Sequence, residues 1–191
     1  MQGESPTSLL DKIAATLAPP ESDEARAEAH RDATALAADN QWLARVLSHH
    51  EDIERGFATA LDATSEAAAR QAVKELGVLL TAHSIAEEVA LYPVLVMKGH
   101  KAHATEAYEE QQMTTVQLAE LERLAPLSQE WRDKLEHIRG AVLHHIYREE
   151  SQWFPEIIRE ASAIDRAMLD ARFSEEFDRS MGRAPAPLQV G

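Results

Sequence analysis

The sequence predicts an all-α protein whose centre is an antiparallel four-helix bundle. Glycine occurs only 7 times in 191 residues and aromatic residues make up 5% of the chain, a balance that favours helices. Apolar residues recur every three or four positions along several long stretches. The breaks between these stretches are short, and long helices with short connections pack as antiparallel neighbours.

The first half of the chain predicts two long helices. Ser22 is a good N-cap residue, and a helical pattern extends from it to about Leu61. A second helix is expected over about 65–97, with Gly99 as its stop. Pro93 falls inside this stretch and should interrupt it, because proline cannot donate the helical hydrogen bond.

The second half predicts two further bundle helices. The third covers about 103–125, and Ser128 caps a fourth that extends to about Ala161. Pro155 lies inside the fourth helix, at the place that Pro93 takes in the second. We therefore expect equivalent kinks in the two helices.

The domain organisation follows from these elements. Residues 1–21 form a short leader, and residues 22–162 form the four-helix bundle. An extra amphipathic C-terminal helix is expected over 163–181. Residues 182–191 are expected to be a flexible tail.

A thirteen-residue pattern occurs twice, over 83–95 (the first copy) and 145–157 (the second copy). Each copy has a His, a Glu four residues later, a second Glu, a bulky apolar residue, an aromatic residue and a Pro. Positions i and i+4 lie on one face of a helix, so each copy directs an imidazole and a carboxylate to the same place.

The two His/Glu pairs predict a metal site inside the bundle. A single His-x-x-x-Glu on a helix is more often a solvated pair, but both copies place these residues on the apolar stripe. Polar groups on a core face are unfavourable unless they are paired or ligate an ion. Imidazole and carboxylate from two facing helices suit one or two transition-metal ions.

Two further segments complete a family resemblance. Residues 48–57 contain a His, then an apolar-Glu pair and a Phe, and residues 106–121 supply a third-helix segment. With the two copies, these segments over about residues 40–160 resemble the hemerythrin-like, HHE cation-binding family. Gln111 stands where that family usually has a His.

The resemblance implies two non-haem iron ions within the bundle. By this likeness His50 and His83 would serve one iron and His145 the other, while Glu87 and Glu149 would bridge the pair. With Gln111 in place of a histidine, the second iron site is expected to be weaker and to keep an open position. Gln111 itself, Glu110, Tyr108 or Glu54 are the available replacements.

Several assignments stay open on sequence grounds. The apolar stripes favour His50 over its neighbour His49 and His145 over His144. Glu54 lies one turn after His50 and is either a surface ion-pair residue or a metal-site residue, as a ligand or as an acceptor that fixes an imidazole. Tyr108 is either a core residue or a site residue.

His100 and His103 lie outside the two copies. They flank a predicted loop, and we expect them to be solvated.

Composition excludes several classes of function. The formal net charge of −14 repels phosphates and disfavours nucleic-acid binding. The absence of cysteine excludes thiolate ligands and iron–sulfur clusters. No signal peptide is evident, and the longest apolar run, 89–97, is too short to span a membrane. A cytoplasmic protein without a membrane partner is expected, and its oligomeric state stays open.

The expected function is a non-haem di-iron protein that binds, senses or buffers dioxygen. The first alternative is a di-iron redox enzyme, peroxidase-like or catalase-like, that acts on peroxide or nitric oxide. The second is an iron-storage or structural metal-binding module. The sequence alone does not choose between carrier, sensor and enzyme.

Overall fold

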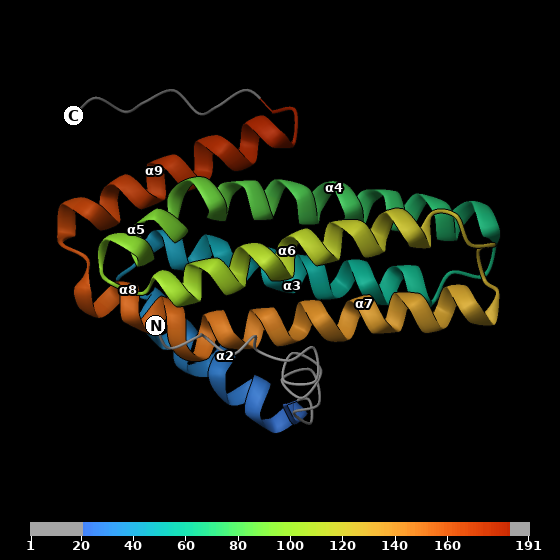
Figure 1. The fold of residues 1–191 in the computed structure, drawn as a ribbon, viewed down its shortest axis with the longest axis horizontal. Helices are drawn as coiled ribbons and strands as arrows, with labels where there is room; N and C mark the ends of the chain where they lie inside the picture. Colours follow the sequence, from blue (N-terminus) through green and yellow to red (C-terminus); the bar gives the residue numbers. More distant parts are fainter. Residues whose placement is uncertain (1–20, 184–191) are drawn as a thin grey trace, which may run out of the picture.

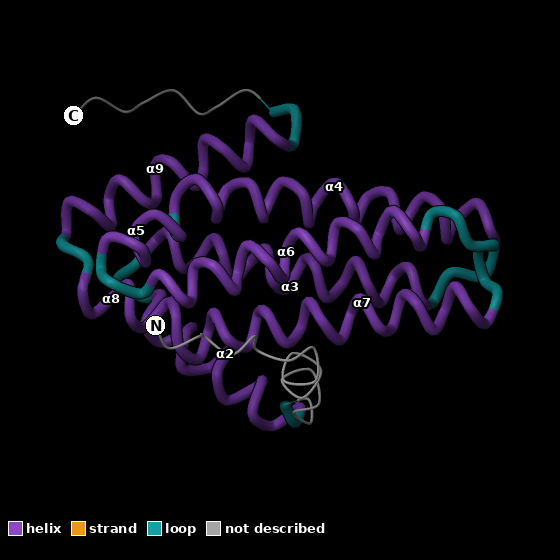
Figure 2. The backbone as a smooth tube through the Cα atoms, viewed as in Figure 1, coloured by secondary structure: helices purple, strands orange, loops and turns teal. Residues whose placement is uncertain are grey.

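The computed structural model describes residues 21–183, and the regular structure of that part is entirely helical (Figure 2). Four long helices form the bundle: α3 (Gln41–Leu61), α4 (Glu66–Ala90), α6 (Lys101–Leu121) and α7 (Gln129–Arg148). Each packs against two others, α3 on α4 and α7, and α6 on α4 and α7. They lie side by side along the long axis (Figure 1), so the all-α fold and the helical bundle are confirmed.

The stretch expected to be one helix from Ser22 to Leu61 is divided, which corrects that prediction. Helix α2 (Asp23–Ala37) ends before Asn40, whose extended backbone (φ −139°) starts α3 in a new direction. The Asn40 side chain donates a hydrogen bond to the carbonyl of Leu36 and holds the corner. Apolar periodicity continues through such a corner, so the pattern alone did not reveal it.

Both expected interruptions at proline are present. Helix α4 ends at Ala90, and the short helix α5 (Tyr92–Met97) begins with Pro93 in its first turn. Helix α7 passes through a π-helical turn, η1 (Glu149–Trp153), into α8 (Phe154–Glu160). Proline has no N–H to donate, which explains a break at each place. The helices α5 and α8 contact each other at the same end of the bundle (Figure 1).

Two helices flank the bundle. Helix α9 (Ala163–Ser180) lies along α4 and α3, and it buries Leu169, Phe173 and Phe177. Helix α2 packs on α3, on η1 and on α7. The predicted leader and tail lie almost wholly outside the described residues.

The apolar core forms two clusters along the bundle axis. One cluster includes Trp42, Leu95 and Phe154, near α5 and α8, and the other includes Phe57 and Leu135, toward the opposite end. Between the two clusters lies a layer of buried polar residues from α3, α4, α6, α7 and η1: His50, His83, Glu87, Gln111, His145 and Glu149. This layer is the candidate functional site.

Candidate metal centre

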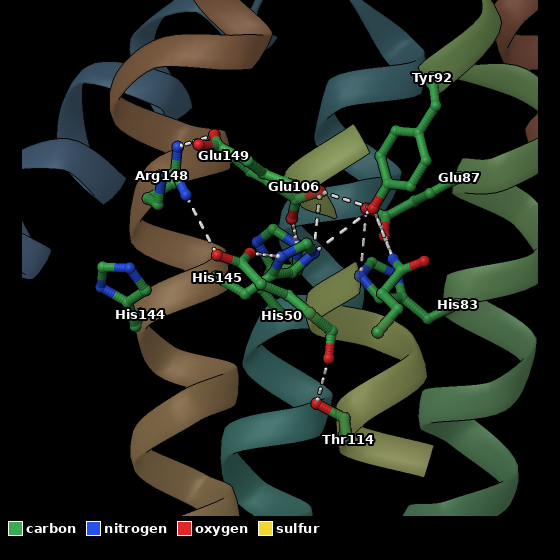
Figure 3. Close-up of polar contacts among 12 residues, drawn as sticks. His50, His83, Glu87, Tyr92, Glu106, Thr114, His144, His145, Arg148 and Glu149 are labelled. Atoms are coloured by element: carbon green, nitrogen blue, oxygen red, sulfur yellow. Dashed lines mark hydrogen bonds and ion pairs between the residues drawn. The ribbon is translucent and has the colours of Figure 1, made fainter. Parts of the chain in front are cut away.

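The polar layer brings together the residues of both copies. One nitrogen or oxygen from each of His50, His83, Glu87 and Glu149 lies within 4.8 Å of all the others. All four side chains are buried, and His145 lies beside them at 7% exposure. α3 supplies His50, α4 supplies His83 and Glu87 one turn apart, and α7 supplies His145, with Glu149 one turn later at the start of η1 (Figure 3).

The inward atoms are held at ligand-like separations. The distance from Nε2 of His83 to Oε1 of Glu87 is 3.2 Å, and that from Nε2 of His145 to Oε1 of Glu149 is 3.3 Å. Nε2 of His50 lies 3.3 Å from Oε2 of Glu149. Ligands about 2.0–2.2 Å from one ion are themselves about 3 Å apart. The two oxygens of Glu149 therefore face two different imidazoles.

Carboxylates outside the layer fix two of these rings. Nδ1 of His50 lies 2.8 Å from Oε1 of Glu150, and Nδ1 of His145 lies 2.7 Å from Oε2 of Glu110. Such partners hold the proton on Nδ1 and leave the Nε2 lone pair free for a metal. Arg148 in turn contacts Glu110 at 3.1 Å.

Several buried polar atoms in the layer have no hydrogen-bond partner. They are Nε2 of His50, both ring nitrogens of His83, Oε1 of Glu87, Oε1 of Gln111 and Oε2 of Glu149. Buried polar groups without partners are rare because each loses its hydration without replacement. Imidazole and carboxylate donors suit iron, zinc or manganese. The residues present fit a transition-metal ion.

The pKa values in the layer are displaced in opposite directions. Burial alone would lower the pKa of His50, but the adjacent carboxylates of Glu149 and Glu150 raise it to about 10. Burial would likewise lower the pKa of His145, but the Glu149 charge and the Glu110 hydrogen bond raise it well above 6.5. Burial acts against ionisation of Glu149, yet His145 and His50 hold its pKa well below 4.5.

The first copy behaves differently. Burial and the positive charge of His50 lower the pKa of His83 well below 6.5. Burial and the charge of Glu149 raise the pKa of Glu87 well above 4.5. These shifts favour the neutral forms of His83 and Glu87 and the charged forms of His145 and Glu149.

Gln111 faces the layer from α6. It is 7% exposed, and its amide nitrogen donates to Oε2 of Glu87 at 2.8 Å and to the Tyr92 hydroxyl at 2.5 Å. The Tyr92 hydroxyl also lies 3.3 Å from Glu87, 3.4 Å from His145 and 3.5 Å from Glu149. Tyr92 was missed from the sequence, although it is the aromatic residue of the first copy.

Both glutamates of the second copy lie in the π-helical turn, and both are buried. Glu149 is 0% exposed and Glu150 is 3% exposed. A π turn carries an extra residue and often marks a functional site. Here Glu149 faces the layer while Glu150 contacts His50 and, at 3.1 Å, Nδ1 of His30 on α2.

Two sequence hypotheses need correction. Glu54 is exposed on α3 and lies outside the cluster, so its one-turn spacing from His50 does not bring it to the site. Tyr108 is 37% exposed, not a core residue, and its hydroxyl donates to the carbonyl of Glu88.

The neighbouring histidines separate as the apolar stripes indicate. His49 stacks on both Phe173 and Phe177 of α9, with ring centroids 5.5 and 3.8 Å away. His144 lies on the outside of α7 (Figure 3) and bonds to Glu21.

A small cavity adjoins the layer. Its volume is about 20 Å³, and it is lined by apolar side chains together with His83, Gln111 and His145. A cavity of about 10–15 Å³ already holds one water-sized molecule. The space beside the imidazoles therefore suits a small diatomic ligand or water. Phe154 stacks on His50 and Trp153 lies edge-on to His145, so apolar rings enclose the other side.

The stretch Glu66–Met97 is long and apolar enough to cross a membrane by composition. However, 56% of its most apolar window is buried inside the structure, and the stretch carries His83 and Glu87 of the polar layer. It is the core helix of the bundle.

Comparison with known proteins agrees with the geometry. A DNA nickase of Nostoc sp. is 32% identical over 78 residues, which cover 41% of this chain and 22% of the nickase. The chain thus spans about a fifth of the length of that curated relative. No solved structure matches significantly. The model of the hemerythrin HHE cation-binding domain matches residues 42–157, which include every residue of the polar layer. The chain therefore belongs to the hemerythrin HHE cation-binding family.

Proposed function

We propose that this protein holds two non-haem iron ions and uses them to bind dioxygen, as a carrier, buffer or sensor. The observation that carries the proposal is the position of Glu149, whose Oε1 faces His145 and whose Oε2 faces His50. A carboxylate between two imidazoles is suited to bridge two ions. His83 and Glu87 add a second such pair within the same layer.

The protein residues would position the ions, enclose a bound ligand and supply a proton to it. The three Nε2 atoms and the two carboxylates would hold the ions, and the outer carboxylates of Glu110 and Glu150 would keep the rings oriented. These residues would hold a ferrous pair, which would supply the two electrons needed to reduce a diatomic ligand. Burial raises the pKa of the Tyr92 phenol well above 10, so its hydroxyl keeps a proton to donate toward the centre.

A di-iron redox enzyme that acts on peroxide or nitric oxide is the second candidate. Gln111 supports this second candidate. A neutral amide in place of an imidazole would leave one metal with fewer nitrogen ligands and an open position. The Tyr92 hydroxyl could supply a proton to such a reaction. An iron-storage or structural role needs neither the open position nor the cavity.

The proposal includes no nucleic-acid or membrane partner and places the protein in the cytoplasm. The Nostoc relative is named for nicking DNA, but the similarity covers 22% of that protein. A formal net charge of −14 works against binding the phosphate backbone.

Metal analysis combined with optical spectroscopy tests the proposal. Protein produced with iron should contain close to two iron ions per chain, and anaerobic reduction followed by aeration should give a reversible visible charge-transfer band. Steady turnover of peroxide without a stable oxygenated form would favour the enzyme. If the spectrum of the iron-loaded protein responds neither to dioxygen nor to peroxide, oxygen binding and redox catalysis are both contradicted, and the structural role is left.

A further inference from the structure

A second cluster of metal-ligating side chains lies away from the polar layer, at the end of the bundle. His100 immediately precedes α6, His103 is in the first turn of α6, and Glu156 is in α8. One donor atom from each lies within 4.8 Å of the other two. The sequence predicts these histidines to be solvated, but their side chains are only 22% and 28% exposed.

The two imidazoles meet at one carboxylate oxygen. Nδ1 of His103 lies 2.9 Å, and Nδ1 of His100 3.3 Å, from Oε2 of Glu156. The two rings are stacked with centroids 5.6 Å apart and planes 11° from parallel. These separations match those between ligands of one divalent ion, which are about 3 Å for bonds of about 2.0–2.2 Å.

The outer contacts repeat the arrangement of the inner layer. The second ring nitrogen of His100, Nε2, lies 3.1 Å from Oε2 of Glu160, one turn after Glu156. In the inner layer, His50 and His145 likewise turn one nitrogen inward and bond the other to a carboxylate. A carboxylate behind a histidine orients the ring and raises its basicity toward a metal.

Packing fixes the position of the cluster. His103 stacks on the buried ring of Trp153, with centroids 6.0 Å apart, and Trp153 packs edge-on to His145 at 5.5 Å. The carboxylates of Glu156 and Glu160 supply negative charge beside the imidazoles, and Arg159 pairs with the far oxygen of Glu160.

We propose that His100, His103 and Glu156 form a second, peripheral binding site for a divalent transition-metal ion such as Zn²⁺, with Glu160 positioning His100. The ligand set of two imidazoles and one carboxylate leaves positions open to water. This site is separate from the inner centre by the width of the Trp153 ring, and it does not depend on which function the inner centre has.

Zinc titration of the iron-loaded protein tests the site. After desalting, mass spectrometry should find one bound zinc per chain with the iron content unchanged. His100→Ala and His103→Ala should weaken zinc binding by at least about 10-fold, and Glu160→Gln, which keeps all three ligands, by about 10-fold. His137→Ala removes an exposed histidine of α7 and should change nothing.

The outcomes separate the two centres. Zinc bound equally by the wild type, His100→Ala and His103→Ala, or no saturable zinc at all, would overturn the peripheral site and leave a histidine–carboxylate hydrogen-bond cluster. Zinc uptake matched by loss of iron would show exchange at the inner centre and would also overturn it. Circular dichroism of each variant confirms that the bundle is intact.

Discussion

The two copies of the repeat are alike in sequence but differ in their local structure. The first copy continues as an α-helix through His83 and Glu87 and breaks only at Leu91. The second copy opens into a π-helical turn directly at Glu149. The second glutamate of the first copy, Glu88, is half-buried, whereas Glu150, on which α2 packs, is buried against His50.

The His/Glu pairs of the two copies also differ in the protonation that their surroundings favour. In the second copy Glu110 supports His145, and two imidazoles face Glu149, so the pKa of His145 is raised and that of Glu149 is lowered, and both shifts favour the charged forms. In the first copy burial lowers the pKa of His83, whose Nδ1 has no hydrogen-bond partner, while burial and the Glu149 charge raise the pKa of Glu87, and both shifts favour the neutral forms.

The aromatic position differs as well. Tyr92 directs a hydroxyl toward the ligands, whereas the equivalent Phe154 stacks on His50 at 6.0 Å. A repeated motif therefore fixes the ligands, while the surroundings of each copy decide their protonation and support. The second copy supplies the preformed, charged half of the centre, and the first copy supplies the adaptable half.

The largest expected effect comes from removing one imidazole of either copy. We predict that His83→Ala and His145→Ala each abolish stoichiometric iron binding, because each removes a buried nitrogen donor beside a carboxylate. His137→Ala is the matched control on the exposed face of α7. Full iron content in both variants, measured by mass spectrometry, would contradict a metal site shared by the two copies.

The sequence was sufficient for those parts of the site that depend on helical periodicity. A spacing of four residues on an apolar stripe placed His83 with Glu87 and His145 with Glu149 on inward faces, and the prolines located both breaks. The same spacing failed for Glu54, because the buried stripe of α3 continues through Ile53 and Phe57 and leaves residue 54 outside.

Other parts depend on long-range packing that periodicity does not encode. Glu150 points about 100° away from Glu149 along a helix, and it is buried because α2 packs against η1 and brings His30 to its carboxylate. The contact of Glu110 with His145 needs the observed register of α6 on α7. The cluster of His100 and His103 with Glu156 forms only because α8 closes over the start of α6.

Metal removal should destabilise the whole bundle. Without an ion, the polar layer retains buried donor atoms without partners between the two apolar clusters. Binding to the folded state alone stabilises it by about 4 kcal/mol at a free-metal concentration 1,000 times Kd. The melting temperature measured by calorimetry should therefore fall after complete chelation and recover when iron is restored. An unchanged melting temperature would show that the layer is stable without metal.

Gln111→His should add a metal ligand from α6 and tighten binding of the second iron. The Gln111 amide now contacts Glu87 and Tyr92, so an imidazole there would face the same ligands. Changes to outer groups alter metal affinity about 10–100-fold, and an added ligand should tighten the second iron by at least as much. Anaerobic iron titration measures this. Identical second-site affinity in wild type and variant would show that residue 111 does not reach the metal.

Glu88 and Glu150, the second glutamates of the two copies, should differ in how much they contribute to iron binding. Glu150→Gln removes the carboxylate that holds Nδ1 of His50 at 2.8 Å, and it should weaken iron binding about 10–100-fold. Glu88→Gln alters the equivalent residue of the first copy, which has no such contact with a histidine of the layer, and should have little effect. Equal losses in the two variants would mean that the π turn gives the second copy no special support.

The smallest effect concerns the aromatic position. Tyr92→Phe gives the first copy the ring that the second copy already has, and it removes the hydroxyl that lies 2.5 Å from the Gln111 amide nitrogen and 3.3 Å from Glu87. Glu87 remains bonded to Gln111, so only part of the network is lost. The free energy of unfolding of the chelated protein should fall by about 1 kcal/mol.

Tyr108→Phe is the control, because its hydroxyl lies on a side chain that is 37% exposed, and it should change the same quantity by about 0.5 kcal/mol or less. Urea denaturation compares the two variants directly. If they lose equal stability, the Tyr92 hydroxyl contributes no more inside the centre than an exposed phenol does, and the two copies differ only through the π turn and its charges.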